Sequence, residues 1–577
     1  MFARKLLAIP LFAAVCCVSC SHGVDEDVRT QADGGQTVTI CASVPEATRT
    51  HMGDRTGSYV PVYWSDGDML NVNGVNSSPL STGGNGELMQ AVFEVKNVSA
   101  PYFAIYPDGI FVSSRDDNRV VTIDIDDVQT YAEDSFAEGS AILYGHAVEE
   151  DEIFFENLCG AVRLSLKGEG LSVSEIRIVS NGGAISGLFD LDVETGALTV
   201  VEGSNSVTLA MPEGGVTLTD TPRDFIITLP AGDYPEGFTV KIKEASSKKT
   251  MNCSWTRMDV SEAVGSGVTL TPGYMADFGE MEFAPTHREI VTGDDFIEFA
   301  LAADGAADTG DADGGEAGDY SDWISPEGEV ELCADITVPQ ICWYTDASQR
   351  RGVITNWYGV FDGNGHTITS ENFWSPVFFN IYEGAAVKNL TLAGVMDKSV
   401  NSGGQSTPGC CVLSGYVYGG EILSCVNRVD ILASLCTNTA MGSMARQIFA
   451  GRIADCRNEG NITYRLASQT SSINAYAGGI VAIVGNLVGE SELLGAVNIE
   501  RCVNNGDISV SVASKMSASY SVNYAAFGGI AAWVCGGSPE RYATFTDCEN
   551  HGSVSVEYPQ TNVVGNAAST TGGIVGW

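Results

Sequence analysis

The sequence predicts an all-β protein in which β-sandwich domains precede a parallel β-solenoid, or β-helix. Short runs of alternating apolar and polar residues fill the first half of the chain, as in half-buried strands. A Cys-x-Asn-x-Gly unit recurs at fixed spacing in the second half. The chain also has 66 glycines in 577 residues without a collagen period, which indicates many tight turns between short strands.

The charge balance excludes one class of partner. The formal net charge is −43, with 73 acidic and 30 basic residues. A field of this sign repels phosphate backbones, so we expect no nucleic-acid partner.

The first 20 residues have the pattern of a secretory signal. Arg4 and Lys5 precede an apolar stretch, which is too short to cross a bilayer as a helix, and Ser19 precedes Cys20. This end resembles the lipobox of bacterial lipoproteins, although Cys17 stands where that motif usually has Leu or Val. The resemblance implies lipidation of Cys20, and an ordinary cleaved signal is the alternative.

Residues 21–35 are expected to form a tether. Asp25, Glu26 and Asp27 resemble the surface-export signal of Bacteroidota lipoproteins, and a plain solvated tether is the alternative. No later segment is long and apolar enough to span a membrane as a helix, so the lipid is the only membrane anchor that we expect.

Residues 36–152 and 153–285 are predicted to be two β-sandwich domains. Runs such as Thr37–Val44, Ala161–Leu166 and Phe238–Lys243 alternate with period two between Gly, Asp, Asn and Pro. No long helical period interrupts them, which favours packed antiparallel sheets.

Short motifs in this region resemble the fimbrillin-like proteins of Bacteroidota. They are Thr48-Arg49-Thr50, Trp64-Ser65-Asp66-Gly67-Asp68, Phe155-Glu156-Asn157-Leu158-Cys159-Gly160, Leu229-Pro230-Ala231-Gly232-Asp233-Tyr234 and Leu270-Thr271-Pro272-Gly273-Tyr274. In pilin members of that family a protease cuts after an arginine, the first strand leaves, and a neighbouring subunit's strand replaces it. The resemblance would place such a cut after Arg49, with Arg29 as a second candidate, but an ordinary exposed turn arginine is the favoured interpretation.

Residues 286–352 are predicted to lead into the solenoid. A short amphipathic helix around Phe296–Leu301 is expected to cover the first rung of the solenoid. Asp308, Asp311 and Asp313 then lie in an acidic, glycine-rich loop. Carboxylates at this spacing could bind calcium, but they do not match the twelve-residue calcium loop, so a plain acidic loop is the favoured interpretation.

Residues 353–577 carry the repeats. The unit contributes Cys456, Asn458 and Gly460, then Cys502, Asn504 and Gly506, then Cys548, Asn550 and Gly552, at 46-residue intervals, with a degenerate copy at Cys425. Gly-Gly-Ile recurs at 478–480, 528–530 and 572–574. Repetition with this period, made of Val, Ile, Gly and Asn, predicts a β-solenoid.

We interpret the Cys-x-Asn-x-Gly unit as a rung corner. Asn and Gly tolerate the left-handed backbone that a sharp bend needs. The cysteines are expected to stack as interior thiols, with disulfides or metal ligation as alternatives. These units resemble the GLUG-type repeats of bacterial surface proteins. Because the sequence stops within a Gly-Gly-Ile copy, the solenoid looks truncated at its C-terminus.

No catalytic, metal or cofactor motif is present. The six histidines are not paired at metal-ligand spacing, and the sequence has no phosphate loop or serine nucleophile elbow. Asp362 and Asp547 could serve as a glycan-cleaving carboxylate pair, although turn positions explain both more simply. Exposed aromatics could stack on sugars, although core packing is the usual role of such residues; they are Trp343, Trp357, Tyr358, Trp374 and Trp533.

We therefore expect an outer-membrane lipoprotein on the cell surface, without enzymatic activity or cofactor. Its expected role is that of an adhesin or pilus-associated protein. Its partners would be a host or neighbouring-cell surface protein or glycan, and other fimbrial subunits. The alternatives are a polysaccharide-acting enzyme on the solenoid and a polymerising pilus subunit.

Overall fold

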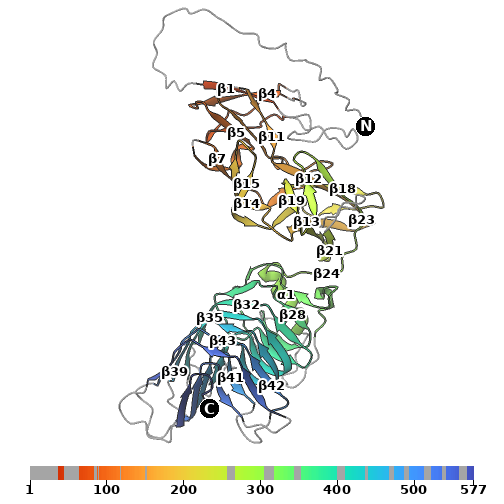
Figure 1. Cartoon of the computed structure of the whole chain (residues 1–577). Coiled ribbons are helices and arrows are strands. Elements are labelled where there is room, and N and C mark those ends of the chain that lie inside the picture. Colours follow the sequence, from red (N-terminus) through yellow and green to blue (C-terminus); the bar gives the residue numbers. More distant parts are fainter. Residues whose placement is uncertain are drawn as a thin grey trace, which may run out of the picture. The chain divides into compact units, whose positions relative to one another are not determined.

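The computed structural model in Figure 1 is built almost entirely of β-strands. It describes residues 37–43, 64–83, 88, 90–116, 118–149, 152–255, 267–304, 318–342, 352–398, 410–435, 439–466, 473–485, 493–512, 522–535, 541–557 and 568–576. Within these ranges the helical elements are α1 (Gly293–Asp304) and two 3-10 turns, η1 (Asp108–Ile110) and η2 (Ser321–Trp323). The predicted all-β class is confirmed.

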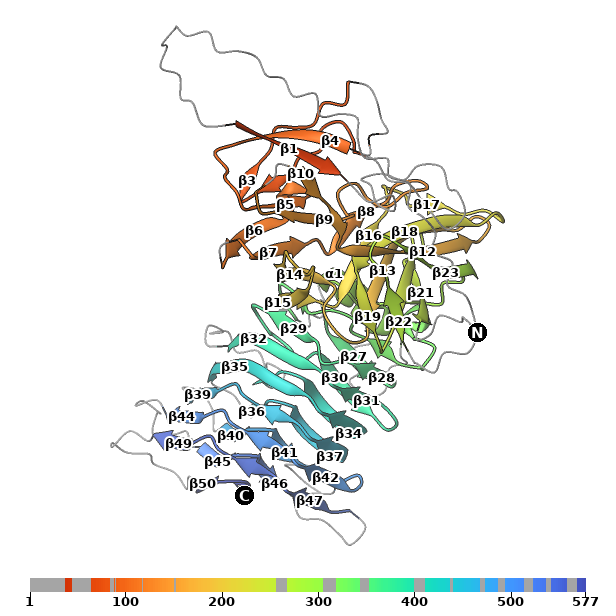
Figure 2. The same ribbon diagram turned by 45° about the horizontal axis from the view of Figure 1, so that its top comes forward.

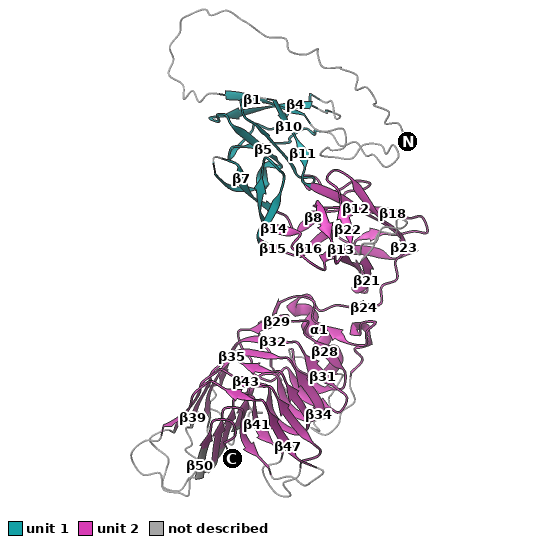
Figure 3. Cartoon of the chain, in the orientation of Figure 1, with its two compact units in different colours: residues 1–124, 141–158, 188–201 teal, residues 125–140, 159–187, 202–577 magenta. Residues whose placement is uncertain are grey.

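The chain divides into two compact units, coloured separately in Figure 3. Unit 1 holds residues 1–124, 141–158 and 188–201, and unit 2 holds the remainder. The units exchange segments along the sequence: β8 (Val128–Thr130) joins a sheet of unit 2, and β14 (Ser186–Asp192) pairs with β7 (Val120–Ile125) in a sheet of unit 1. The division of the sandwich region near residue 152 stays a prediction.

Unit 1 contains three small sheets, with strand orders β10-β1-β4, β11-β9-β5-β2-β3 and β15-β14-β7-β6. Trp64 is fully buried at the centre of its core and meets three rings edge-on, those of Phe93, Tyr106 and Phe155. The remaining strands are β1 (Thr37–Ser43), β2 (Asn71–Val72), β3 (Val75–Asn76), β4 (Gln90–Lys96), β5 (Tyr102–Tyr106), β6 (Phe111–Arg115), β9 (Leu143–Ala147), β10 (Glu152–Phe154), β11 (Glu156–Asn157) and β15 (Leu198–Ser204).

The first part of unit 2 is built from sheets with strand orders β18-β12-β23, β24-β21-β20-β13-β16-β8 and β19-β22, and β17 also pairs with β13. Alternate residues of these strands point into one apolar core, as period-two patterning predicts. The strands are β12 (Cys159–Lys167), β13 (Ser172–Ser180), β16 (Ser206–Ala210), β17 (Val216–Thr217), β18 (Arg223–Pro230), β19 (Gly232–Tyr234), β20 (Phe238–Glu244), β21 (Lys249–Trp255), β22 (Val268–Leu270), β23 (Met275–Glu282) and β24 (His287–Arg288).

The helix expected near residue 296 is α1, and its apolar side packs on the first strands of the solenoid. Phe299 meets Trp357 edge-on at a ring-centroid distance of 5.9 Å, and Phe296 meets Phe361 at 6.4 Å. All four rings are fully buried. Thr292 and Asp295 cap the helix reciprocally, because the amide of Asp295 donates to Thr292 Oγ1 while the amide and hydroxyl of Thr292 donate to the Asp295 carboxylate.

The second part of unit 2 is a parallel β-solenoid, whose stacked strands are visible in Figure 2. Its three sheets contain only parallel pairs among the described residues. The first sheet holds β25 (Val330–Glu331), β27 (Ile354–Trp357), β28 (Val360–Asp362), β30 (Phe378–Tyr382), β31 (Ala386–Lys388), β34 (Ser414–Leu423), β37 (Ala445–Ala454), β41 (Val481–Val484), β42 (Val497–Glu500), β46 (Ala531–Val534) and β47 (Ala543–Thr546). The second holds β26 (Ile336–Thr337), β29 (Thr367–Ser370), β32 (Thr391–Lys398), β35 (Val426–Leu435), β38 (Arg457–Asn458), β39 (Ile462–Leu466), β43 (Val503–Asn504), β44 (Ile508–Val512), β48 (Glu549–Asn550) and β49 (Val554–Glu557). The third holds β33 (Cys410–Cys411), β36 (Thr439–Gly442), β40 (Ile473–Gly478), β45 (Val522–Gly528) and β50 (Ala568–Gly572).

Candidate functional site

Several residues singled out from the sequence lie outside the described ranges. They are Cys20, Arg29, Arg49, Asp308, Asp311, Asp313 and Trp343. Among the residues that are described, no helix is long and apolar enough to cross a membrane, and no three His, Cys, Asp or Glu side chains converge as they would around a metal ion.

The repeat asparagines form a buried hydrogen-bond ladder through the solenoid. The side-chain amide of Asn427 donates to Asn458 Oδ1, Asn458 donates to Asn504, and Asn504 donates to Asn550, each at 2.7 Å. The same amide groups also donate to backbone carbonyls within their own rung, for example Asn504 to Gly506 at 2.9 Å. Because Asn458 and Asn504 are fully buried, this ladder satisfies polar groups that would otherwise be costly to bury.

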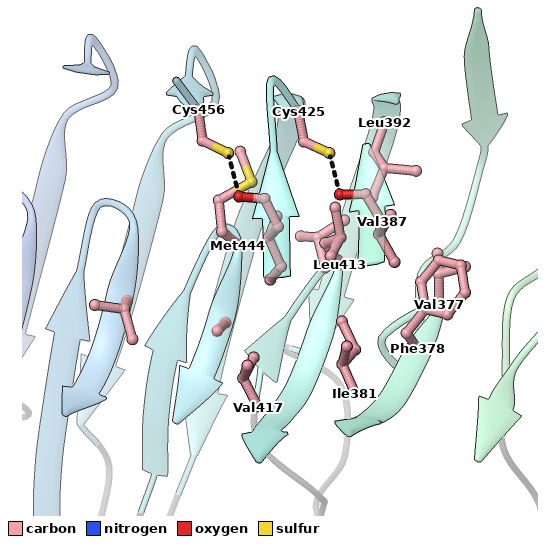
Figure 4. Close-up of a cluster of buried hydrophobic side chains, with 14 of the residues drawn as sticks. Val377, Phe378, Ile381, Val387, Leu392, Leu413, Val417, Cys425, Met444 and Cys456 are labelled. Atoms are coloured by element: carbon pink, nitrogen blue, oxygen red, sulfur yellow. Dashed lines mark hydrogen bonds between the residues drawn. The ribbon is translucent and has the colours of Figure 1, made fainter. Parts of the chain in front are cut away.

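The repeat cysteines stand beside this ladder and point into the core, as Figure 4 shows for Cys425 and Cys456. The Cys456 thiol donates to the carbonyls of Ala454 and Ile422, and Cys502 makes the equivalent pair of contacts one rung further on. Burial raises the pKa of Cys456 well above its ordinary value. Cys425, Cys456 and Cys502 form no disulfide, so these thiols act as small apolar side chains with one weak donor each.

The left-handed backbone of the corner lies at a different position from the one expected. Positive φ angles occur at Asp455 (58°), Arg501 (50°) and Asp547 (51°), each immediately before a repeat cysteine, and not at the asparagine or glycine of the unit. The glycines are required for another reason. A Cβ on Gly506 would lie 1.9 Å from the carbonyl oxygen of Gly460 in the rung below. The expectation that Asn and Gly adopt the left-handed conformation was therefore wrong. The asparagine fills the core, and the glycine permits neighbouring rungs to stack closely.

Asp362 and Asp547 do not form a catalytic pair. Asp362 ends β28, Asp547 follows β47, and β31, β34, β37 and β42 lie between them in the same sheet. Five steps of about 4.8 Å separate them by roughly 24 Å, against roughly 5–10 Å in glycosidase pairs.

Asp362 has a local structural role. It accepts the amide N–H of Asn364 and contacts Lys388 at 3.1 Å. Burial alone would raise the pKa of Asp362, but these donors and Asn389 hold it below its ordinary value.

The aromatic side chains proposed as sugar-stacking residues differ in exposure. Trp357 is fully buried, and Trp533 is half-buried against Tyr476. Trp374 is also half-buried, whereas Tyr358 is 39% exposed.

Tyr358 begins a column of rings that runs across successive strands of the first solenoid sheet. Its ring stacks on Tyr382 at 4.7 Å, Tyr382 stacks on Tyr418 at 5.5 Å, and Tyr418 stacks on Phe449 at 4.9 Å. The ring planes are within 16° of parallel. We call Tyr358, Tyr382, Tyr418 and Phe449 the aromatic column.

Leu494 and Tyr542 lie on the rungs that follow Phe449. The amide of Leu494 donates to the carbonyl of Phe449, and the carbonyl of Tyr542 accepts the amide of Val497 on the neighbouring rung. Leu494 is 60% exposed and Tyr542 is 47% exposed. The sequence could not reveal this surface, because its members occur at irregular spacings between loops of different lengths.

The first strand occupies the centre of a sheet in unit 1. β1 pairs with β4 in antiparallel register and with β10 in parallel register. Ile40 and Ala42 are fully buried in the core of the unit. β1 thus completes both the hydrogen bonding and the packing between β4 and β10.

Comparison with known proteins gives similarity only at the level of solved structures; no family model and no curated protein matches the chain. A candidate cell adhesion protein from Bacteroides ovatus is 14% identical, with a TM-score of 0.27, and the match covers 43% of this chain and 93% of that one. One from Bacteroides uniformis is 13% identical, with a TM-score of 0.26 and coverages of 43% and 94%. The tip fimbrial protein Mfa3 of Porphyromonas gingivalis, truncated at its C-terminus, is 8% identical, with a TM-score of 0.24 and coverages of 43% and 95%.

These matches are with proteins described as cell adhesion and fimbrial tip proteins. The resemblance of the repeats to GLUG-type units has no counterpart among them. At such low identities and TM-scores the similarity carries no inference about what this chain binds.

Proposed function

We propose that this protein is a cell-surface lipoprotein, anchored in the outer membrane through Cys20, that acts as an adhesin or pilus-associated binding protein. Its partner would be a surface protein or glycan of a host or neighbouring cell. The observation that carries the proposal is the aromatic column with Leu494 and Tyr542, an apolar surface that follows successive solenoid rungs.

The stacking geometry favours a protein partner over a glycan. Tyr382 and Tyr418 each have a neighbouring ring on both faces. A sugar stacks on an open ring face, whereas the middle of this column offers ring edges and phenolic hydroxyls. Apolar side chains of a protein can pack against such edges.

A triple variant with Tyr358→Ser, Leu494→Ser and Tyr542→Ser tests the surface. The change removes exposed apolar area and leaves the buried core intact, so we expect unchanged thermal unfolding and at least about a tenfold loss of binding to host or neighbouring cells. Val148→Ser in unit 1, where Val148 is 69% exposed, is the matched control and should bind normally. Full binding by the triple variant would show that the partner does not bind this surface.

Intact mass of the protein from its native envelope tests the anchor. Acylated Cys20, together with loss of the protein when whole cells are treated with external protease, would support a surface lipoprotein. An unlipidated protein, or one protected from external protease, would refute this location.

A pilus subunit is the second candidate, and the placement of β1 favours it. Removal of this central strand would open a slot between β4 and β10, whose exposed backbone a partner's strand could pair with. A mature N-terminus at Thr50 and recovery of the protein in polymers would support this role. An N-terminus at Cys20 in all surface material would contradict it.

A further inference from the structure

Residues 286–291 carry the chain from the sandwich sheet of unit 2 into the solenoid. On one side, β24 pairs with β21 through Arg288↔Lys249 and His287↔Thr250. On the other side, Ile290 forms a parallel bridge with Leu332, and its carbonyl accepts the amide of Cys333 at 2.8 Å. Glu289 is the single residue between these two pairings.

Glu289 turns its carboxylate back onto the sandwich sheet. Lys241 Nζ lies 2.7 Å from Oε1, Arg177 Nη2 lies 3.1 Å from Oε2, and Asn252 Nδ2 lies 3.3 Å from Oε1. These partners come from three adjacent strands, β20, β13 and β21. We call Glu289, Lys241, Arg177 and Asn252 the joint network.

The joint network is largely buried, so separating its charges has a high free-energy cost. The side chains of Glu289, Lys241 and Arg177 are 4%, 18% and 17% exposed. Burial alone would raise the pKa of Glu289, but Lys241 and Arg177 hold it below its ordinary value. Pulling this carboxylate out would leave two cations partly buried without their anion, which costs far more than breaking an exposed ion pair.

More exposed contacts surround the joint network. Glu298 of α1 pairs with Lys248 at 2.9 Å and with Arg288. The Arg288 guanidinium also lies 3.9 Å from the centroid of the Trp323 ring. Because Glu298 is 44% exposed, its ion pairs contribute less than those of Glu289.

We propose that the joint network locks residues 286–291 into a stiff joint, so that this segment is not a free linker between sandwich and solenoid. Opening the joint requires the extraction of Glu289 and the loss of the β21–β24 pairing. A force applied to the solenoid is then carried into the sandwich sheet mainly through Glu289, because the surrounding contacts of Glu298 are more exposed. The stiffness of the joint does not depend on the ligand or on the aromatic column. The joint proposal can therefore be refuted while the proposed binding function stands.

Hydrogen exchange of the full-length protein tests the lock. In the wild type we expect the amides of residues 287–290 to exchange about as slowly as those of β21. Glu289→Gln keeps the size of the side chain and removes its charge, and it should speed exchange of this segment at least about tenfold. Glu298→Gln is the matched control, because it removes an exposed carboxylate beside the same segment, and it should change the rates less than about threefold.

Two outcomes would overturn the proposal. One is exchange of residues 287–290 in the wild type at the rate of an unprotected linker. The other is equal protection in the Glu289→Gln and Glu298→Gln variants. If Glu289→Gln does not fold, Lys241→Gln keeps the Arg177–Glu289 pair and should show a smaller increase confined to the same segment; no increase would also refute the lock.

Discussion

Gly479 and Asn504 belong to different repeat motifs and pack directly against each other. A Cβ built on Gly479 would lie 2.1 Å from the carbonyl oxygen of Gly529 on the next rung, and 2.4 Å from Cγ and 2.6 Å from Oδ1 of Asn504. The same relationship recurs one rung later, where a Cβ on Gly529 would lie 2.2 Å from Asn550 Cγ. The second glycine of Gly-Gly-Ile therefore makes room both for the backbone of the next rung and for the asparagine ladder of the next Cys-x-Asn-x-Gly unit, which explains why the two motifs recur together.

Gly479→Ala should destabilise the solenoid. The added methyl group must displace the carbonyl oxygen of Gly529 and the buried, hydrogen-bonded Asn504, and overpacking of this kind costs about 1–3 kcal/mol. Urea unfolding with unchanged m-values would measure the loss.

The third Gly-Gly-Ile copy supplies the control for this prediction. No atom lies within 4 Å of a Cβ built on Gly573, so Gly573→Ala should leave the unfolding free energy nearly unchanged. Equal effects of the two substitutions would show that the close contacts of Gly479 with Gly529 and Asn504 are not what requires glycine.

Asn504→Ala should also lower the unfolding free energy. The substitution removes the acceptor of Asn458 and the donor to Asn550, and each buried group left without a partner costs about 1–3 kcal/mol. The neighbouring Asn505 is exposed, and Asn505→Ala should have little effect. A neutral Asn504→Ala would mean that water replaces the ladder.

Arg501 makes a favourable ion pair from an unfavourable backbone conformation. Its φ of 50° costs an arginine about 1–2 kcal/mol, whereas Asn tolerates this region. The ion pair with Asp455, at 2.6 and 2.7 Å, is nearly half exposed, so solvent screens it and it contributes little to stability. Arg501→Asn should therefore leave stability unchanged or raise it slightly, as measured by thermal unfolding.

Arg452 is the control for the cost of the positive φ at Arg501. It pairs with Glu500 at 2.9 Å without a positive φ, so Arg452→Asn loses an ion pair and relieves no strain. A larger loss for Arg501→Asn than for Arg452→Asn would contradict the argument.

The contrast between Asn504 and Arg501 shows how far the sequence could predict the site. The repeat period and its Val and Ile content were sufficient for a parallel solenoid, and the helix near Phe296 followed from its cap and apolar spacing. The left-handed corner could not be found, because the residues that occupy it, Ser424, Asp455, Arg501 and Asp547, share no chemistry.

The joint network was equally invisible in the sequence. Arg177, Lys241 and Glu289 are far apart in the chain, and only the order of strands β13, β20 and β21 brings them together. The aromatic column depends in the same way on the register between β30, β34 and β37.

Glu244 gives the sandwich of unit 2 a pH-dependent stability. Glu244 is only 3% exposed, and its carboxylate accepts hydrogen bonds from the backbone amides of Ser246 and Ser247 at 3.0 and 2.6 Å. Burial alone would raise the pKa of Glu244, but these donors and the serine hydroxyls lower it from 4.5 to about 2. A depressed carboxylate pKa contributes stability that is fully present above the unfolded-state value and is lost as the pH falls through the folded-state value.

We therefore expect the difference in unfolding free energy between wild type and Glu244→Gln to be largest above pH 5 and to shrink toward pH 2. The full difference is at most about 3.5 kcal/mol, because the pKa is lowered from 4.5 to about 2 and one pKa unit corresponds to about 1.4 kcal/mol. Chemical denaturation of both proteins at several pH values measures it, and the subtraction removes the contribution of the other carboxylates. A constant difference across this range would mean that Glu244 contributes through its shape and not through its charge.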